Sequence, residues 1–431
     1  MITTAFVNIW GERVGAIAWD ATSGLGSFEY ETAFLKKGLA LSPLMMPVSE
    51  AVKRIFTFAD LRDLNTFKGL PGLVADVLPD KYGHALINAW LAKHGRASES
   101  LNPVELLCFI GSRGMGALEF EPVVPKFDGV VSPIELNSLI SVAEGILSGR
   151  KNFRVKLSAK DEKGLLDILK IGTSAGGARA KAVIAFNPKT KELRSGQAAA
   201  PKGFSQWIIK FDGVTDHQMG SSHGYGRVEM AYYLMAKAAG IRMSESRLLE
   251  EHGRAHFMTR RFDREHGNKK LHFQSFCALC HFDFNDVHRY SYEQLFETMR
   301  LLALPYPQAE QLYRRMVFNV MARNCDDHTK NFAFLMDQKG VWSLSPAFDV
   351  CHAYRPGSDW VSQHSLSING KRKNIERSDL MLVAQQMSIK KASYIIKEIA
   401  AVVREWNTYA NYVGVETKLM KAIEKTLIIL D

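Results

Sequence analysis

Three oxygen-bearing side chains in the second half of the chain have the types and the spacing that phosphoryl transfer requires. Asp326 precedes Asn331 by five residues in the stretch 324–332, and Asp349 ends the motif Ser-Pro-Ala-Phe-Asp. The same spacing separates an aspartate from an asparagine in catalytic loops that transfer phosphate. Such a reaction needs a carboxylate that orients the attacking hydroxyl and oxygen ligands for magnesium. We therefore predict that Asp326 is catalytic and that Asn331 and Asp349 bind the metal.

A structural explanation of these residues stays open when they are taken alone. Asp and Asn in a polar turn often satisfy backbone donors between a helix and a hairpin. Lys210, near the end of the apolar run 207–211, is ambiguous in the same way. Its ammonium either points to solvent or binds nucleotide phosphates, steadied by Glu229 from the next predicted helix.

A glycine-rich segment at 172–181 lies between two apolar segments ahead of Lys210. Its glycines let backbone N–H groups approach phosphate oxygens, and Arg179 and Lys181 add positive charge. The segment is neither a Walker loop nor a dinucleotide fingerprint, because Lys-Ser/Thr does not follow a second glycine at the required spacing. The order of phosphate loop, strand lysine, helix glutamate, catalytic loop and late aspartate together predicts an enzyme that transfers phosphate from a nucleotide.

The elements that must position these groups divide the chain into a sheet-rich half and a helix-rich half. Apolar periodicity predicts strands at 181–186 and 207–211, and helices at 227–239 and 308–324. A hairpin of 332–336 and 341–344 follows the catalytic loop. It can return Asp349 to a cleft between two lobes, where a site is expected.

Nearer the N-terminus, the runs 7–10 and 14–19 flank Gly11-Glu12 and predict a hairpin. Asn102-Pro103 with Glu105 predicts the start of a helix, and Gly111 its end. We place a boundary at the polar, proline-containing stretch 122–133. The expected domains are an N-terminal subdomain, a sheet-rich lobe with the phosphate loop and hinge, and a helical lobe with the catalytic loop and metal site. Their ranges are 1–125, 140–265 and 266–431.

The composition is that of a globular protein, with 46% hydrophobic and 23% charged residues. The net charge of +10 favours anionic partners, although a basic surface can also serve solubility alone. Five cysteines, an odd count without the density of a disulfide scaffold, fit a reducing cytoplasm. We see no export signal and no apolar run that could span a bilayer, so we expect a cytoplasmic protein without membrane contact.

Over nearly its whole length the chain resembles the HipA kinases of bacterial toxin–antitoxin modules. The resemblance is most specific at Asp326-Asp-His-Thr-Lys-Asn331 and Phe348-Asp349, and it extends to 70–81, 261–264 and 364–371. It implies an α+β, bilobal, protein-kinase-like fold with an additional N-terminal α/β subdomain. The activity that it implies is that of a serine/threonine protein kinase that uses ATP and Mg²⁺.

The resemblance also implies roles for individual residues. The loop 172–181 corresponds to the ATP loop of the family, in which Ser174 is the autophosphorylated serine. A phosphate on Ser174 would repel the phosphates of ATP and switch the enzyme off. Backbone groups of 260–262 form a hinge that binds adenine, and Glu229 is the ion-pair partner of Lys210. The residues expected to contact ATP are Gly176, Gly177, Ala178, Arg179, Ala180, Lys181, Lys210, Arg260, Arg261, Phe262, His328, Lys330 and Asn331.

The family implies three macromolecular partners. A small helix-turn-helix antitoxin, HipB-like, inhibits the kinase and joins it on operator DNA. The expected substrate is an aminoacyl-tRNA synthetase, glutamyl-tRNA synthetase foremost, whose phosphorylation slows translation and growth and promotes persistence. The basic run Lys371, Arg372 and Lys373 aligns with the DNA-contacting segment of the family, where basic side chains neutralise phosphates. A solvated charged loop is the simpler explanation of that run.

Two positions depart from the best-known relative, in which Asp327 is a glycine and Arg179 a glutamine. An extra carboxylate beside Asp326 could change the affinity for metal or substrate. Two other functions stay open: a catalytically silent protein that binds operator DNA with its antitoxin, and a small-molecule kinase. Retention of the whole set of catalytic and metal groups argues against the silent protein, and the toxin-like N-terminal block argues against the small-molecule kinase.

Overall fold

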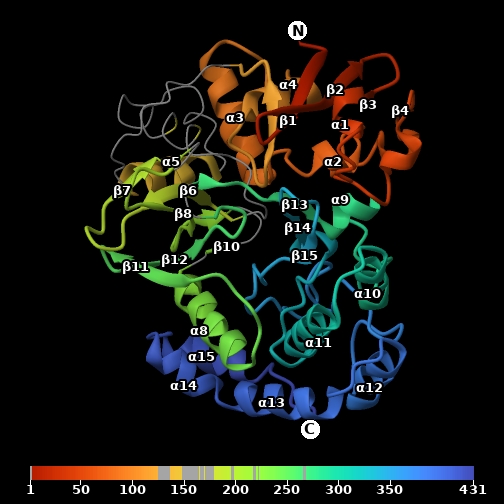
Figure 1. The fold of residues 1–431 in the computed structure, drawn as a ribbon. Coiled ribbons are helices and arrows are strands. Elements are labelled where there is room, and N and C mark those ends of the chain that lie inside the picture. Colours follow the sequence, from red (N-terminus) through yellow and green to blue (C-terminus); the bar gives the residue numbers. More distant parts are fainter. Residues whose placement is uncertain are drawn as a thin grey trace.

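The computed structural model describes residues 2–124, 136–147, 165, 169, 179–195, 199–216, 220–221, 223–265 and 268–431. Figure 1 shows the N-terminal sheet and its helices at the top, the middle sheet at the left and the helical C-terminal part at the bottom. The two termini lie at opposite ends of the molecule (Figure 1). No helix in the described ranges is long and apolar enough to cross a membrane. The expected boundary at 122–133 lies mostly within 125–135, outside the described residues.

The N-terminal part is built on an antiparallel sheet with the strand order β4-β3-β2-β1-β5. Its strands are β1 (Thr4–Ile9), β2 (Glu12–Asp20), β3 (Leu25–Tyr30), β4 (Ile55–Phe56) and β5 (Leu118–Glu121). Val7 and Ile9 are buried while Phe6 is exposed, which is the alternation of a strand with one face on a core. The predicted hairpin is confirmed, because Ile9 pairs with Glu12 across a turn in which Gly11 has φ 82°.

Short helices complete the N-terminal part. They are α1 (Thr32–Leu35), α2 (Gly72–Ala75), α3 (Lys81–Lys93) and α4 (Pro103–Ile110), with the 3-10 turns η1 (Val48–Glu50) and η2 (Ala59–Leu61). The helix α4 begins and ends where its sequence predicts. Asn102 and Glu105 form a capping box that satisfies the first backbone N–H groups, and the chain leaves the helix at Gly111 with φ 59°.

The middle part contains a second antiparallel sheet, with the strand order β11-β12-β8-β6-β7. The elements of the middle part are α5 (Leu136–Leu147), β6 (Lys181–Phe186), β7 (Leu193–Ser195), β8 (Ser205–Lys210), β9 (Thr215–Asp216), β10 (Gly220–Ser221), α8 (Tyr225–Ala238), β11 (Ser246–Glu251) and β12 (Arg254–Arg260). Of these strands, β9 and β10 pair with each other outside the five-stranded sheet. The predicted strands and helix of this region are confirmed with small shifts at their ends. Apolar periodicity does not resolve the hairpin β11–β12, whose outer strand carries Arg247, Glu250 and Glu251.

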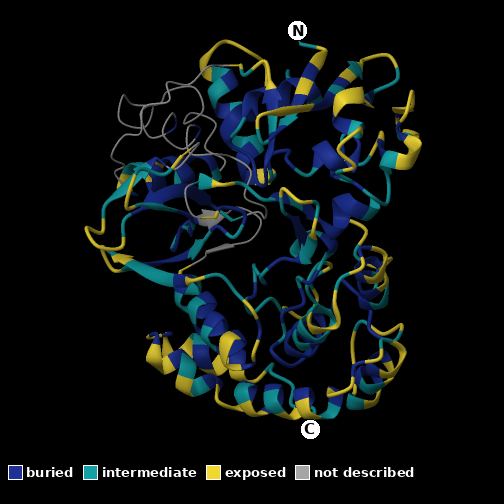
Figure 2. Cartoon of the chain, in the orientation of Figure 1, coloured by how far each residue is buried: buried dark blue, intermediate teal, exposed yellow. Residues whose placement is uncertain are grey.

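One apolar core runs through both sheets. Val7 and Phe28 of the N-terminal sheet belong to the same buried cluster as Ile184 and Trp207 of the middle sheet. A second cluster fills the helical C-terminal part. Figure 2 shows the buried residues concentrated along the strands and on the inner sides of the helices. Because the first core is shared, the N-terminal part and the middle sheet hold each other in place.

The C-terminal part is helical around a small three-stranded sheet, β13-β14-β15, counted over the described residues. Its elements are β13 (His272–Ser275), α9 (Phe276–Cys280), α10 (Tyr292–Leu301), α11 (Tyr306–Met321), η4 (Thr329–Asn331), β14 (Ala333–Met336), β15 (Trp342–Leu344), α12 (Arg377–Gln386), α13 (Ala392–Arg404), α14 (Trp406–Tyr412) and α15 (Thr417–Glu424). The predicted hairpin is confirmed as β14–β15. The sequence misses β13, which pairs His272 with Met336, because so short a strand is defined by a partner distant along the chain.

A buried ionic cluster fixes the segment between the middle and C-terminal parts. The Asp263 carboxylate accepts hydrogen bonds from Arg261 at 2.9 and 2.6 Å, from Arg264 at 2.5 Å and from the Gly116 N–H at 2.7 Å. Both arginines also donate to the Gly114 carbonyl, at 3.0 and 3.1 Å. Burial opposes the ionised carboxylate, but the two guanidinium groups outweigh it and lower the pKa of Asp263. The cluster therefore ties a turn of the N-terminal part to the predicted hinge.

Asp263→Ala should lower the free energy of unfolding by about 3–5 kcal/mol, because it leaves two guanidinium groups buried without a carboxylate. As a control, Asp286→Ala removes an exposed carboxylate that lies 3.8 Å from Arg289, and it should cost less than about 1 kcal/mol. Urea midpoints of both variants, followed by circular dichroism, provide the comparison. Equal midpoints would show that the cluster does not hold the fold.

Candidate active site

Lys210 joins three distant parts of the chain. Its Nζ lies 2.5 Å from Oε1 of Glu229, on α8, and also contacts Oδ1 of Asp349. The Glu229 side chain is 6% exposed, whereas that of Asp349 is 24% exposed and remains within reach of a ligand. The structure thus brings together the predicted strand lysine, helix glutamate and late aspartate.

A glycine allows Glu229 to approach Lys210. A Cβ atom at Gly226 would lie 1.9 Å from the carbonyl oxygen of Ala255 on β12, so only glycine lets α8 pack this closely against the sheet. Glu229 follows one turn later on the same helix, since residues three apart lie on one face. The helix–sheet distance therefore decides whether the ion pair can form.

The charges of this cluster depend on one another. Burial alone would lower the pKa of Lys210, but Asp349 and Glu229 outweigh it and raise that pKa. Burial opposes ionisation of Asp349, yet the Lys210 and Lys181 charges prevail and lower the pKa of Asp349. Burial raises the pKa of Glu229 in spite of Lys210. At neutral pH the lysine therefore carries its positive charge and Asp349 its negative charge.

Asp326 lies on the loop after α11, with its side chain 37% exposed. Its backbone carbonyl accepts a hydrogen bond from Nδ2 of Asn331 at 2.6 Å, which closes the loop across the predicted spacing. Its Oδ1 accepts a hydrogen bond from Nε1 of Trp360 at 2.7 Å and lies 3.7 Å from Nε2 of His328. Burial raises the pKa of Asp326, with His328 and Trp360 opposing that change.

Asp349 adopts a backbone conformation that is rare for a residue with a side chain, with φ 51°. Such strain persists where the surroundings over-determine it, and it concentrates at functional sites. The preceding residue, Phe348, packs its ring 5.4 Å from that of Phe262 in the hinge, which itself lies 6.1 Å from Phe273 of β13. These aromatic contacts hold the strained turn against the hinge.

Asp327 is a buried structural residue. Its Oδ2 accepts hydrogen bonds from the Tyr292 hydroxyl and from Nδ1 of His364, each at 2.8 Å, and its Oδ1 accepts one from the Ser365 N–H at 2.8 Å. The side chain is 0% exposed. Its oxygens are therefore engaged inside the protein, and an effect of this extra carboxylate on metal or substrate affinity stays a prediction.

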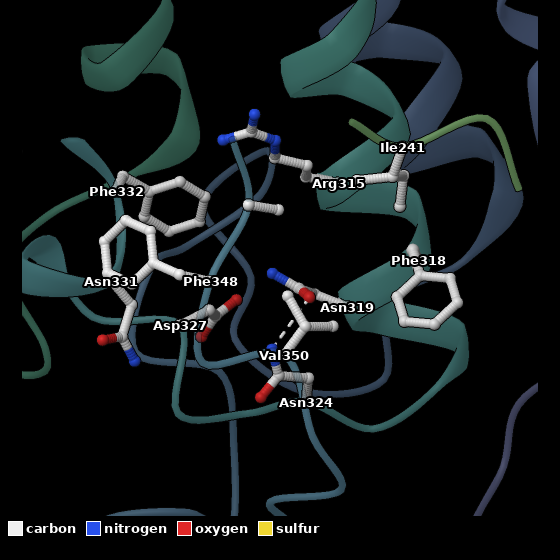
Figure 3. A pocket seen from close by; sticks show the side chains of 11 residues that line it. Ile241, Arg315, Phe318, Asn319, Asn324, Asp327, Asn331, Phe332, Phe348 and Val350 are labelled. Atoms are coloured by element: carbon white, nitrogen blue, oxygen red, sulfur yellow. Dashed lines mark hydrogen bonds between the residues drawn. The ribbon is translucent and has the colours of Figure 1, made fainter. Parts of the chain in front are cut away.

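The network around Asp327 continues beneath the catalytic loop. Nδ2 of Asn319 donates to the Tyr292 hydroxyl at 2.9 Å, and Nδ2 of Asn324 donates to Oδ1 of Asn319 at 3.0 Å, the dashed line in Figure 3. Figure 3 shows Asn319, Asn324 and Asp327, which line a small cavity together with Arg315. The volume of this cavity is about 10 Å³. That volume suits a single water, so the cavity supports the loop and does not admit a substrate.

The backbone N–H groups of two hinge residues are already used. The Arg260 N–H donates to the Glu245 carbonyl at 2.8 Å, and the Arg261 N–H donates to the Gln206 carbonyl at 2.9 Å. A nucleotide base at this hinge would therefore contact carbonyl groups or the backbone of Phe262. The Arg261 side chain is committed to Asp263, as described above.

The phosphate loop is described only at its end. Gly176, Gly177, Ala178 and Ser174 lie outside the described residues. The Arg179 guanidinium lies 4.4 Å from the ring centre of Tyr225. Ala180 is buried, and its carbonyl accepts a hydrogen bond from the Phe211 N–H at 3.0 Å.

Lys181 is bound by the N-terminal part. Its Nζ lies 2.8 Å from Oδ2 of Asp80, the residue that caps the start of α3, and both side chains are largely buried. A phosphate bound by Lys181 would therefore compete with Asp80. The N-terminal part reaches into the predicted ATP site through this pair.

The remaining predicted residues lie in two places. His328 and Lys330 follow Asp326 on the same loop, with Lys330 Nζ 5.0 Å from the ring centre of Phe284. In the basic run, Lys371 forms an ion pair with Asp379 at 2.9 Å, and Arg372 donates to backbone carbonyls, including that of Tyr290 at 3.1 Å. Lys373 is exposed. Part of the basic run thus serves internal contacts.

The oxygen donors fit magnesium bound together with a nucleotide. Nδ2 of Asn331 donates to the Asp326 carbonyl, which leaves Oδ1 of Asn331 for a cation. Asp349 supplies a carboxylate. Magnesium in such sites takes one or two protein oxygens and completes its shell with phosphates and water. Over the described part of the chain, no group of three or more His, Cys, Asp or Glu side chains could hold a metal by itself.

Two family models match the sequence. Residues 5–121 match the HipA N-terminal domain and residues 173–406 match the HipA-like C-terminal domain. The chain belongs to the HipA family. Among curated proteins, no sequence matches it significantly.

The fold agrees with this membership. The HipA of Shewanella oneidensis MR-1, solved with HipB and operator DNA, matches with a TM-score of 0.68 and 17% identity, covering 98% of this chain and 95% of that one. The similarity to a Helicobacter pylori proinflammatory kinase, CtkA, is weak, with a TM-score of 0.31 and 12% identity over 51% of this chain and 90% of that one. The predicted α+β, bilobal, kinase-like fold with an additional N-terminal subdomain is confirmed.

Sequence reasoning misses two contributors to this HipA-family site. Trp360, which binds Asp326, lies in a polar loop, and the only local signal is a tryptophan within Pro-Gly-Ser-Asp-Trp. The partners of Asp327, chiefly His364 and Tyr292, are separated from it by 37 and 35 residues. No local pattern connects them.

The His364–Asp327 pair predicts how stability changes with pH. Burial alone would keep the imidazole neutral, but the Asp327 carboxylate outweighs it and raises the pKa of His364 from 6.5 to about 10. Because the folded-state pKa is the higher one, the stabilisation should be complete below pH 6.5 and should vanish as the pH rises through 10. Unfolding free energies of wild type and His364→Gln, compared across this range, should converge at high pH. A difference independent of pH would mean that His364 is neutral in the folded protein.

Proposed function

We propose that this HipA-family chain is an ATP- and Mg²⁺-dependent serine/threonine protein kinase and the toxin of a toxin–antitoxin pair. The observation that carries the proposal is the contact of Lys210 with both Glu229 and Asp349. Asp326 and Asn331 lie together on one short loop of the same chain. Phosphoryl transfer uses such a set: an amine for the phosphates, a carboxylate that steadies it, metal ligands and a carboxylate at the acceptor hydroxyl.

Each residue of the set has a distinct task in this mechanism. Lys210, held by Glu229, binds the phosphates of the nucleotide. Asp326, which is partly exposed, accepts in its ionised form a hydrogen bond from the serine or threonine hydroxyl and directs it at the γ-phosphate. Asn331 and Asp349 would hold Mg²⁺, which would neutralise negative charge on the phosphates.

The wider ATP site follows from the same placement. The carbonyl groups of the hinge 260–262 would bind adenine, and the loop 172–181 would cover the phosphates. Lys181, now paired with Asp80, would contribute a second cation beside Lys210. His328 and Lys330 complete the proposed ATP contacts from the catalytic loop.

The proposed partners follow the family. A HipB-like helix-turn-helix antitoxin would inhibit the kinase, and the two proteins would bind operator DNA together, as the assembly of the Shewanella HipA with HipB and operator DNA supports. Exposed Lys373, and Lys371 where it can leave Asp379, would contact DNA phosphates. The proposed substrate is an aminoacyl-tRNA synthetase, such as glutamyl-tRNA synthetase, whose phosphorylation would arrest translation.

Asp326→Asn should lower the rate of phosphate transfer at least about a hundredfold, because an amide cannot act as the base-like partner of the hydroxyl. Its affinity for ATP should change little, since Lys210, Asn331 and Asp349 are retained. Labelled ATP measures self-phosphorylation, and calorimetry measures binding. The control, Asp359→Asn, alters an exposed carboxylate and should keep full activity. Full activity in Asp326→Asn would refute the proposed mechanism, and binding of operator DNA without any kinase activity in wild type would favour the silent corepressor.

Ser174→Ala should abolish self-phosphorylation while phosphorylation of other proteins continues. A phosphate on Ser174 would add nearly two negative charges beside the phosphates of ATP and weaken nucleotide binding. Mass spectrometry of the purified protein locates the phosphate, and Thr173→Val serves as the neighbouring hydroxyl control. Stoichiometric phosphate on another residue of Ser174→Ala would overturn the assignment.

A further inference from the structure

Trp360 makes a direct contact with the proposed catalytic carboxylate. Its indole Nε1–H donates a hydrogen bond of 2.7 Å to Oδ1 of Asp326, across 34 residues of sequence. His328 approaches the same oxygen, with its Nε2 at 3.7 Å. Among the described residues, these contacts of the carboxylate fall on Oδ1. Oδ2 is therefore the oxygen that a substrate hydroxyl can approach.

The loop that carries Trp360 runs from 353 to 365, and each of its ends is hydrogen-bonded to a residue next to Asp326. At its start, the Cys325 N–H donates to the Ala353 carbonyl at 3.1 Å. At its end, the Ser365 N–H donates to Oδ1 of Asp327 at 2.8 Å. The two residues that flank Asp326 thus close the loop at its two ends. Its position relative to the catalytic carboxylate is fixed by this arrangement.

The Trp360 ring is held as well. Within the loop, Oγ of Ser358 accepts hydrogen bonds from the backbone N–H groups of Trp360 and Val361, each at 3.3 Å, and these fix the backbone that carries the ring. The indole lies 6.1 Å from the ring of Phe284 and 6.0 Å from that of His328, both at steep angles. A half-buried aromatic group pinned in this way can present its N–H in one direction only.

We propose that Trp360 is a positioning residue for phosphate transfer. By binding Oδ1, it holds the Asp326 carboxylate in the rotamer that presents Oδ2 to the hydroxyl of the protein substrate. The inference rests on the kinase function proposed above, because it assigns Trp360 to the same site. A carboxylate free to rotate would meet the hydroxyl in a productive geometry less often, and small misplacements are costly in catalysis.

The test replaces the N–H without removing the ring. Trp360 is exchanged for β-(3-benzothienyl)alanine, an isosteric residue with sulfur in place of the N–H, and separately Trp360→Phe is made. We expect kcat to fall on the order of tenfold or more in both variants, with KM for ATP unchanged, as for the loss of a hydrogen bond to a charged group. Trp342→Phe is the matched control, since it removes an indole N–H that donates to the Ala40 carbonyl at 3.3 Å, and it should keep the wild-type kcat.

A second measurement does not depend on activity. Proton–nitrogen spectra resolve the indole N–H signals of the seven tryptophans, and the signal missing from Trp360→Phe belongs to Trp360. In Asp326→Ala, that signal should move upfield because its acceptor is gone. Wild-type kcat in the benzothienyl variant, or an unmoved indole signal, would overturn the inference. Activity retained in Asp326→Asn would instead refute the kinase mechanism itself, so the two failures are distinguishable.

Discussion

The candidate site depends on one partly exposed ammonium group shared by two carboxylates. Lys210 belongs to the middle sheet, Glu229 to the helix beside it and Asp349 to the turn after the last strand of the C-terminal sheet. A charge removed from water is costly unless it is paired, so this cluster is stable only when all three segments are in place. The cluster therefore couples the closure of the two lobes to the assembly of the site. It also leaves Asp349 more exposed than Glu229, on the side where a metal and phosphates would enter.

The same physical rule organises the supports of the site. Asp263 and Asp327 are carboxylates without solvent exposure, and each is neutralised by cations or hydrogen-bond donors from other parts of the chain. Asp263 ties the hinge to the N-terminal part, and Asp327 ties the catalytic loop to the segment that follows Trp360. These buried polar groups contribute to a single arrangement of the loops, because any displacement would leave a charge unpaired in a medium of low dielectric constant.

The N-terminal part takes part in the site and does not merely accompany it. It shares an apolar core with the middle sheet, supplies Asp80 to Lys181 and meets the hinge at Gly114 and Gly116. In the HipA family this part is a domain of its own, and here its contacts reach the lysine at the end of the phosphate loop. A change in the position of the N-terminal part would therefore change the pairing of Lys181 with Asp80, and under the proposed function the charge available for nucleotide phosphates.

The sequence by itself determined the elements whose signals are local. The capping box of α4, the hairpin β1–β2, the strand β6 and the spacing of Asp326 and Asn331 are readable because they depend on residues a few positions apart. The motif order also predicted that Lys210, Glu229 and Asp349 act together. Only the tertiary structure decided that Asp327 is an internal support, that β13 joins β14, that Lys181 pairs with Asp80 and that Trp360 binds Asp326. These partners are separated by 34 residues or more, and their pairing is decided by which buried polar groups the packed core brings within hydrogen-bond distance.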